Sequence, residues 1–140
     1  MSDVHSVITR SYNMSQIKRT NTKPEVVVRK YLFSKGFRYR INDKRYPGRP
    51  DIVLSKYKTV IFINGCFWHV HEGCKYFVWP KSNEDFWKMK LLSNKENDRK
   101  NIEKLRALGW KVIIIWECEL RKGKREDQLK QVVFEILSTL

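Results

Sequence analysis

The spacing of apolar and polar residues predicts three helices and four short strands. Segment 37–41 alternates apolar and basic residues as a strand does, and 51–54 and 59–63 have the length of two strands joined as a hairpin. The most apolar run, WKVIIIW at 110–116, predicts a buried strand in the centre of the sheet. The helices are predicted at about 22–34, 83–108 and 125–139. This order predicts an α/β fold, with helices packed on a mixed central sheet.

Local signals mark the borders of the first helix and of the turn that follows it. Thr22 and Glu25 fit a capping box, with Pro24 in the first helical turn. Gly36 ends the helix, as glycine often does. The sequence YPGRP at 46–50 predicts a turn.

The charge of the chain points to a polyanionic partner. The 29 Lys and Arg residues exceed the 15 Asp and Glu residues, which gives a formal net charge of +14. Such a charge on 140 residues favours nucleic acid, because neutralised phosphates release their counterions. The alternative is a basic surface that only keeps the protein in solution.

The length of the chain is that of one domain. Residues 1–20 are polar and are expected to form an N-terminal arm or a loose helix that contacts the nucleic acid, and 21–140 to form the folded domain. No stretch approaches the ~18 apolar residues of a membrane helix, and the N-terminus lacks the apolar core of a signal peptide. We therefore expect a cytoplasmic protein. We also expect a monomer, associated with the nucleoid through its nucleic-acid partner.

The stretch NGCFWHVHEGC at 64–74 gathers soft metal ligands. An odd number of cysteines, three, favours metal or thiol chemistry over disulfides. The candidate ligands are Cys66, His69, His71, Cys74 and Cys118. A structural zinc needs four of them, so one histidine is free for other work, and spacing does not say which. The alternative is that Cys66 and Cys118 are core thiols and the histidines are incidental.

Asp51 follows the turn and opens a strand. This arrangement resembles the PD…(D/E)xK nucleases, in which the acid binds a Mg²⁺ ion that activates water. The second half of that pattern is absent, because Ile63-Asn64-Gly65 contains neither an acid nor a lysine. Pro-Asp is also an ordinary turn pair.

Two further acids lie on the apolar faces of predicted helices. Leu91, Ile102 and Leu105 fall within about 40° of Asp98 on the long helix. A lone carboxylate is costly there unless it is bonded, and a buried salt bridge is the alternative to a functional role. Glu25 has the capping box as its alternative role.

Five segments together closely resemble the very short patch repair (Vsr) endonucleases. They are PGRPDIV at 47–53, VIFINGCFWHVHEGC at 60–74, EDFW at 84–87, NDRKN at 97–101 and LGWKVIIIWECEL at 108–120. The resemblance implies a restriction-endonuclease-like fold of the PD-(D/E)xK type, with a zinc-stapled aromatic loop. It also implies a Mg²⁺-dependent enzyme that nicks DNA beside the thymine of a T:G mismatch left by deaminated 5-methylcytosine.

The resemblance implies roles for the residues that match the family's motifs. Asp51 would bind Mg²⁺ together with the backbone carbonyl of Ile63. His69 would be the catalytic histidine, and Glu25 and Asp98 would hold metal-bound waters. The implied zinc ligands are Cys66, His71, Cys74 and Cys118.

Aromatic residues of the family wedge into the duplex beside the mismatch. Phe67, Trp68 and Trp87 match them, and Met14 matches a residue inserted from the minor groove. Unstacking costs less at a mismatch, so the wedge itself would select the site. Core packing is the alternative for these aromatics.

The chain departs from the family pattern at two places. Ile63-Asn64 stands where the best-known members carry Thr-His, and Asn64 can bond a water or a phosphate but cannot take up a proton. The loop also has Glu72-Gly73 before Cys74, a spacing that differs by one residue from some members.

Three functions compete at this point. The first is a mismatch-nicking repair endonuclease. The second is a relative that cleaves or nicks intact DNA in a restriction or mobile-element system. The third is a zinc-stapled DNA-binding module without catalysis, which the set of Asp51, His69, Glu25 and Asp98 argues against.

Overall fold

A computed structural model describes residues 23–121 and 123–138. Its main elements are α2 (Lys23–Ser34), β1 (Arg40–Ile41), β2 (Ile52–Leu54), β3 (Thr59–Asn64), α3 (Glu84–Ala107), β4 (Lys111–Trp116) and α4 (Arg125–Leu137). Short 3₁₀ turns, η2 (Ser55–Tyr57) and η3 (Glu117–Leu120), follow β2 and β4. The predicted order of helices and strands is confirmed. The expected arm at 1–20, with Met14, lies outside the described residues, as does Thr22 of the expected capping box.

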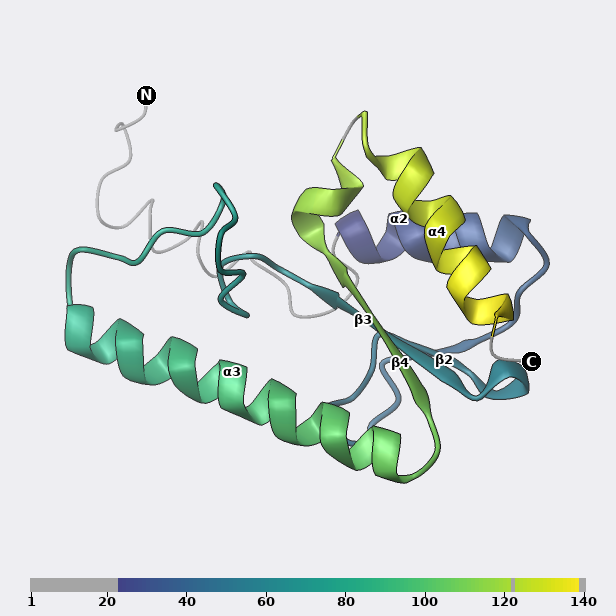
Figure 1. Ribbon diagram of the computed structural model, residues 1–140, viewed down its shortest axis with the longest axis horizontal. Helices are drawn as coiled ribbons and strands as arrows, with labels where there is room; N and C mark the ends of the chain where they lie inside the picture. Colours follow the sequence, from purple (N-terminus) through teal and green to yellow (C-terminus); the bar gives the residue numbers. More distant parts are fainter. Residues whose placement is uncertain (1–22, 122, 139–140) are drawn as a thin grey trace.

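The four strands form one mixed sheet in the order β1-β2-β3-β4. β2 and β3 form the predicted antiparallel hairpin, and β4 lies parallel to β3. α2 and α4 cover one face of the sheet and α3 covers the other (Figure 1). The predicted α/β fold with helices on a mixed sheet is therefore confirmed.

The prediction that 110–116 forms a central strand is wrong. Among the described residues β4 pairs only with β3, so it is an edge strand of the sheet. Its apolar character comes from the two covered faces, because Ile113 and Ile115 pack into the core under α2 and α4 while Val112 packs on the α3 side. Continuous hydrophobicity thus reports covered faces and not the position of a strand within the sheet.

The first strand is also shorter than predicted. β1 contains only Arg40 and Ile41 instead of 37–41. Phe37 turns into the core, where it is 6% exposed, and Asn42 has a left-handed backbone with φ 49°. The strand is thus confined to the two residues between these points.

The sheet brings chain segments that are distant in sequence to one edge. Because β3 and β4 are parallel, with Asn64 opposite Trp116, the carboxyl ends of both strands lie at the same edge of the sheet. The loop after β3 and the turn η3 start there, and the first half of α3 runs beyond the sheet below that loop (Figure 1). No helix of the described segments is long and apolar enough to cross a membrane.

Candidate active site and metal cluster

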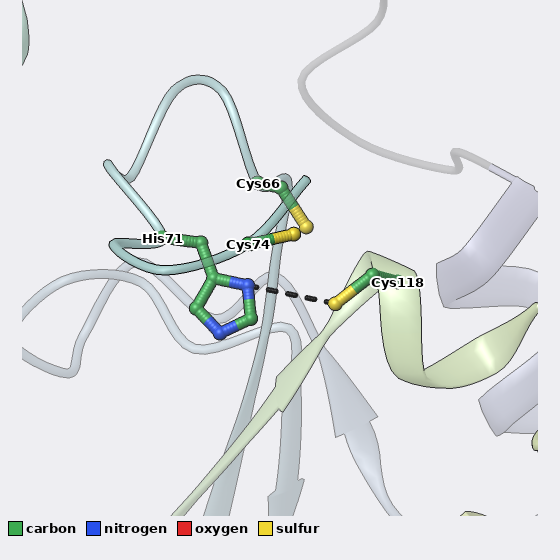
Figure 2. Close-up of side chains that lie close together, drawn as sticks. All are labelled: Cys66, His71, Cys74 and Cys118. Carbon is green, nitrogen blue, oxygen red and sulfur yellow. Dashed lines mark hydrogen bonds between the residues drawn. The ribbon is translucent and has the colours of Figure 1, made fainter. Parts of the chain in front are cut away.

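Three cysteines and one histidine form a cluster at the edge where β3 and β4 end. The ligand atoms of Cys66, His71, Cys74 and Cys118 all lie within 4.8 Å of one another. Figure 2 shows the four side chains pointing toward a common centre, three from the loop after β3 and Cys118 from η3. A metal ion at this centre would tie the loop to the end of β4.

The backbone of the loop and a tryptophan hold the ligand His71 in place. The His71 N–H donates to the Cys66 carbonyl at 3.0 Å, and the Cys74 N–H donates to the His71 carbonyl at 3.2 Å. The indole of Trp116 stacks on the His71 ring, with centroids 4.0 Å apart and planes 3° apart. The ring thereby presents Nδ1 to Cys118 Sγ, at 3.5 Å.

Three thiols and an imidazole suit a soft cation with tetrahedral coordination. Four protein ligands leave no open coordination position for substrate. Burial raises the pKa of the Cys66 thiol to about 12, so this thiol keeps its proton as long as no cation replaces it. The residues therefore fit a structural metal site.

The second histidine of the loop faces another site. His69 Nδ1 lies 2.5 Å from Asp98 Oδ2 on α3. Val70, between the two histidines, is buried and has φ 52°, an unusual backbone for a β-branched residue. This left-handed turn directs His69 toward α3 and His71 toward the cysteines. The partner of Asp98 is thus a histidine of the loop after β3, and both side chains are partly exposed, so the pair is not the buried salt bridge that was the alternative for Asp98.

Two more side chains tie the loop to the exposed half of α3. Asn94 donates from Nδ2 to the Trp68 carbonyl at 3.2 Å, and Lys95 pairs with Glu72. The sequence reasoning did not single out Asn94, although it precedes Asp98 by one helical turn and therefore shares its face. The four-residue spacing between Asn94 and Asp98 was the signal in the sequence that could have identified Asn94.

Asp51 lies directly before β2, in a partly buried position beside β3. Its Oδ2 accepts a hydrogen bond from the Ile63 N–H at 2.6 Å. Burial raises the pKa of Asp51 to about 7 in spite of that bond, and the nearby charge of Glu25 adds to the increase. A carboxyl group that lacks a compensating charge in this way is suited to a cation.

Glu25 is 3% exposed, and its Oε2 accepts a hydrogen bond from Arg29 Nη2 at 3.0 Å, one helical turn along α2. The three acids predicted for the site therefore have different environments: Glu25 faces an arginine, Asp98 a histidine, and Asp51, among the described residues, only a backbone N–H.

A cavity of about 830 Å³ connects these groups. The predicted site residues on its wall are Glu25, Asp51, Ile63, Asn64, Phe67, Trp68, His69 and Asp98. The metal cluster is outside this set, so the structure separates the two groups of predicted residues. Arg49 also lines the cavity, and the sequence reasoning gave it no role.

The predicted wedge residues form an aromatic cluster at the rim of this cavity. Phe67 packs on Trp68 and on Trp87, with ring centroids 5.1 Å and 5.5 Å apart, and Phe77 and Phe86 extend the cluster. All three predicted wedge residues are partly exposed, and none belongs to the two core clusters of the sheet. Packing in the sheet core, the alternative for these aromatics, is therefore not what the structure shows.

Known proteins match this chain along nearly its whole length. A family model described as DNA mismatch endonuclease Vsr matches residues 2–75, just over half of the chain. The chain belongs to this family. A type II nicking enzyme, V.NmeAIP of Neisseria meningitidis, is 54% identical over 97% of this chain and 97% of its own. The DNA mismatch endonuclease Vsr of Escherichia coli is 45% identical over 86% of this chain and 77% of its own. The type II nicking enzyme V.XorIIP of Xanthomonas oryzae is 41% identical over 95% and 98%.

Family membership decides between the broad classes of function. The protein is a DNA endonuclease with the restriction-endonuclease-like fold of its family, as the resemblance implied. The non-catalytic binding module is thus the weakest of the three readings. The names of the relatives divide between nicking enzyme and mismatch endonuclease, which bears on the substrate.

The raised pKa of Asp51 predicts a pH-dependent cost to stability. At pH values below its usual pKa of 3.8, Asp51 is protonated in the folded and the unfolded protein. As the pH rises from there to about 7, the unfolded chain loses the proton first, so the stability of the folded state falls. In Mg²⁺-free protein Asp51→Asn should therefore raise the free energy of unfolding by roughly 1.5 kcal/mol at pH 5 and about 4 kcal/mol at pH 8.

Urea unfolding of both proteins at the two pH values measures this difference. The amide keeps an oxygen that can accept the Ile63 N–H, so the comparison isolates the charge. Equal effects at pH 5 and pH 8 would contradict a raised pKa.

Proposed function

We propose that the protein nicks one strand of duplex DNA by Mg²⁺-dependent hydrolysis of a phosphodiester. The observation that carries the proposal is the convergence of Asp51, Ile63 and the His69–Asp98 pair on one cavity, beside partly exposed aromatic rings. One such set of residues serves one phosphodiester bond, and we expect the protein to act as a monomer in the cytoplasm.

Asp51 and the Ile63 carbonyl are the proposed Mg²⁺ ligands. Pairing of Ile52 with Ile61 places Pro50 opposite Ile63 if the register is continued. Proline has no N–H, so the ladder offers no donor to the Ile63 carbonyl, while the Ile63 N–H turns to Asp51. The proline of the Pro-Asp pair thus frees a second oxygen beside the carboxylate. When bound there, Mg²⁺ would activate water and stabilise charge on the phosphate.

His69 is the proposed proton-transfer group. Its Nδ1 is engaged by Asp98, which fixes the ring and leaves Nε2 to exchange a proton with the attacking water or the leaving oxygen. Asn64, on the same cavity wall, can only hydrogen-bond. Glu25 and Asp98 would in addition orient waters around the metal.

We further propose that the Cys66–His71–Cys74–Cys118 cluster holds a zinc ion. Its support is the composition and geometry of the ligand set. The ion would fix the loop that carries His69 and the aromatic cluster, because that loop has few regular hydrogen bonds of its own.

Nicking of regular duplex DNA is favoured by the 54% identical relative, which is a type II nicking enzyme. Nicking beside a T:G mismatch is the second candidate, favoured by the aromatic cluster and by the 45% identical mismatch endonuclease. Wedging of Phe67, Trp68 and Trp87 between bases would cost less at a mispair. The basic charge, the arm at 1–20 and Met14 would contribute to DNA binding in both cases.

A nicking assay tests both candidates on two duplexes that are identical except at one position, where one carries a T:A pair and the other a T:G mismatch. We expect cleavage of one strand with Mg²⁺, none without it, and a loss of several orders of magnitude in Asp51→Asn, because a metal-binding charge is removed. Trp68→Ala should reduce the T:G to T:A rate ratio if the mismatch is read by wedging. A ratio near one in the wild type would assign the protein to regular duplex DNA, and absence of nicking on every duplex would disprove the enzyme proposed here.

Metal analysis tests the zinc proposal. We expect about one zinc per chain in the wild type and in His69→Ala, but little zinc and a lower unfolding midpoint in His71→Ala. The reason is that, of the two described histidines, His71 faces the cysteines and His69 faces Asp98. Loss of zinc in His69→Ala with retention in His71→Ala would reverse the two roles.

A further inference from the structure

Within the described residues, Arg49 is a cation without a counter-ion, although the wall of its cavity carries four carboxylates, Glu25, Asp51, Asp98 and Glu117. It is partly buried and lines the same wall as Asp51. Glu25 pairs with Arg29 and Asp98 with His69, and the structure shows no ion pair between Arg49 and either Asp51 or Glu117 among the described residues. Across residues 23–121 and 123–138, Arg49 takes part in no salt bridge, side-chain hydrogen bond or ring contact, unlike the neighbouring Arg45. A partly buried guanidinium without such partners has N–H donors available for an anion from outside the chain.

The turn that carries Arg49 is held rigidly. Arg49 has φ 48°, and its N–H donates to the Tyr46 carbonyl at 3.0 Å. Gly48 has φ 77°, and a Cβ there would lie 3.0 Å from Asn101 Cβ and 3.2 Å from the Phe62 ring. The turn is therefore seated against α3 and β3 with no room for a side chain at 48, and it fixes the backbone of Arg49 two residues before Asp51.

The end of β3 supplies no cation for the reacting phosphate. Ile63-Asn64-Gly65 lacks the lysine of the nuclease pattern, so the charge must come from another element. Lys90 also lines the cavity, but it is exposed and stands on the part of α3 that carries the aromatic cluster. Arg49 stands on the short turn that leads into the proposed metal ligand.

We propose that Arg49 is a catalytic residue that binds a non-bridging oxygen of the scissile phosphate. The inference rests on the proposed nuclease function and deepens it. In the hydrolysis the water oxygen bonds to phosphorus, one P–O ester bond breaks, and the water protons end on the leaving oxygen and in solvent. Negative charge on the non-bridging oxygens grows in the transition state, and the planar guanidinium matches a phosphate with two parallel N–H donors.

Single-turnover nicking at saturating enzyme, together with DNA affinity without Mg²⁺, separates this role from general DNA binding. We expect Arg49→Ala to lower the single-turnover rate by about 10²–10³-fold, with less than about a tenfold loss of affinity. Arg49→Lys should recover part of the rate, because it retains the charge but loses the paired donors. Arg106→Ala is the matched control: Arg106 is exposed, lies outside the cavity and carries the same charge. It should leave the rate unchanged.

Arg49→Gly is a second variant that tests the same role if Arg49→Ala misfolds, because glycine adopts a φ of 48° without strain. A wild type that does not nick would overturn the proposed function as a whole. A wild type that nicks, with Arg49→Ala and Arg49→Gly as fast as Arg106→Ala, would overturn the role of Arg49 alone. A loss confined to DNA affinity, with an unchanged single-turnover rate, would also overturn it.

Discussion

The four-residue cluster at the ends of β3 and β4 is the constraint on which the site depends. The loop after β3 has no regular secondary structure through residue 83, yet it carries His69 and three rings of the aromatic cluster. Its position relative to the sheet is set by Cys66, His71 and Cys74 meeting Cys118. Loops of this length need a covalent or metal tie when they bury little apolar surface. Once the tie is made, the Val70 turn directs His69 to Asp98.

The sheet imposes a second constraint, on the charge of the cavity. Continued beyond the paired residues, the antiparallel register would place Pro50, which has no N–H, opposite Ile63, and the Ile63 N–H goes to Asp51. Asp51 is largely removed from solvent and forms no ion pair within the described residues; burial raises its pKa to about 7, whereas Glu25 and Asp98 have partners. In the proposed function Asp51 would bind the metal and Arg49 the anion. The two are only two residues apart on a rigid turn.

Much of this architecture follows from the sequence, because periodicity and ligand chemistry are local properties. The hairpin of β2 and β3 and the long helix α3 were predicted close to their observed bounds. The edge position of β4 was not, because an apolar strand reads the same at the edge and in the centre when both of its faces are covered.

The division of labour between the histidines could not be read from spacing. It depends on the left-handed backbone of Val70, a conformation that a β-branched residue rarely adopts and that no sequence rule predicts. Arg49 was overlooked for a related reason: an arginine among 29 basic residues reads as surface charge until the structure shows what lies around it.

The central claim is that the metal cluster holds His69 against Asp98. The most direct test is NMR of the protein with ¹⁵N-labelled histidine, which follows the His69 Nδ1 resonance before and after the metal is removed with a chelator. The account predicts a downfield proton on Nδ1, bonded to Asp98, that disappears when the cluster is emptied. A His69 signal that persists unchanged in the metal-free protein would show that the loop positions His69 without the cluster, and would contradict the account.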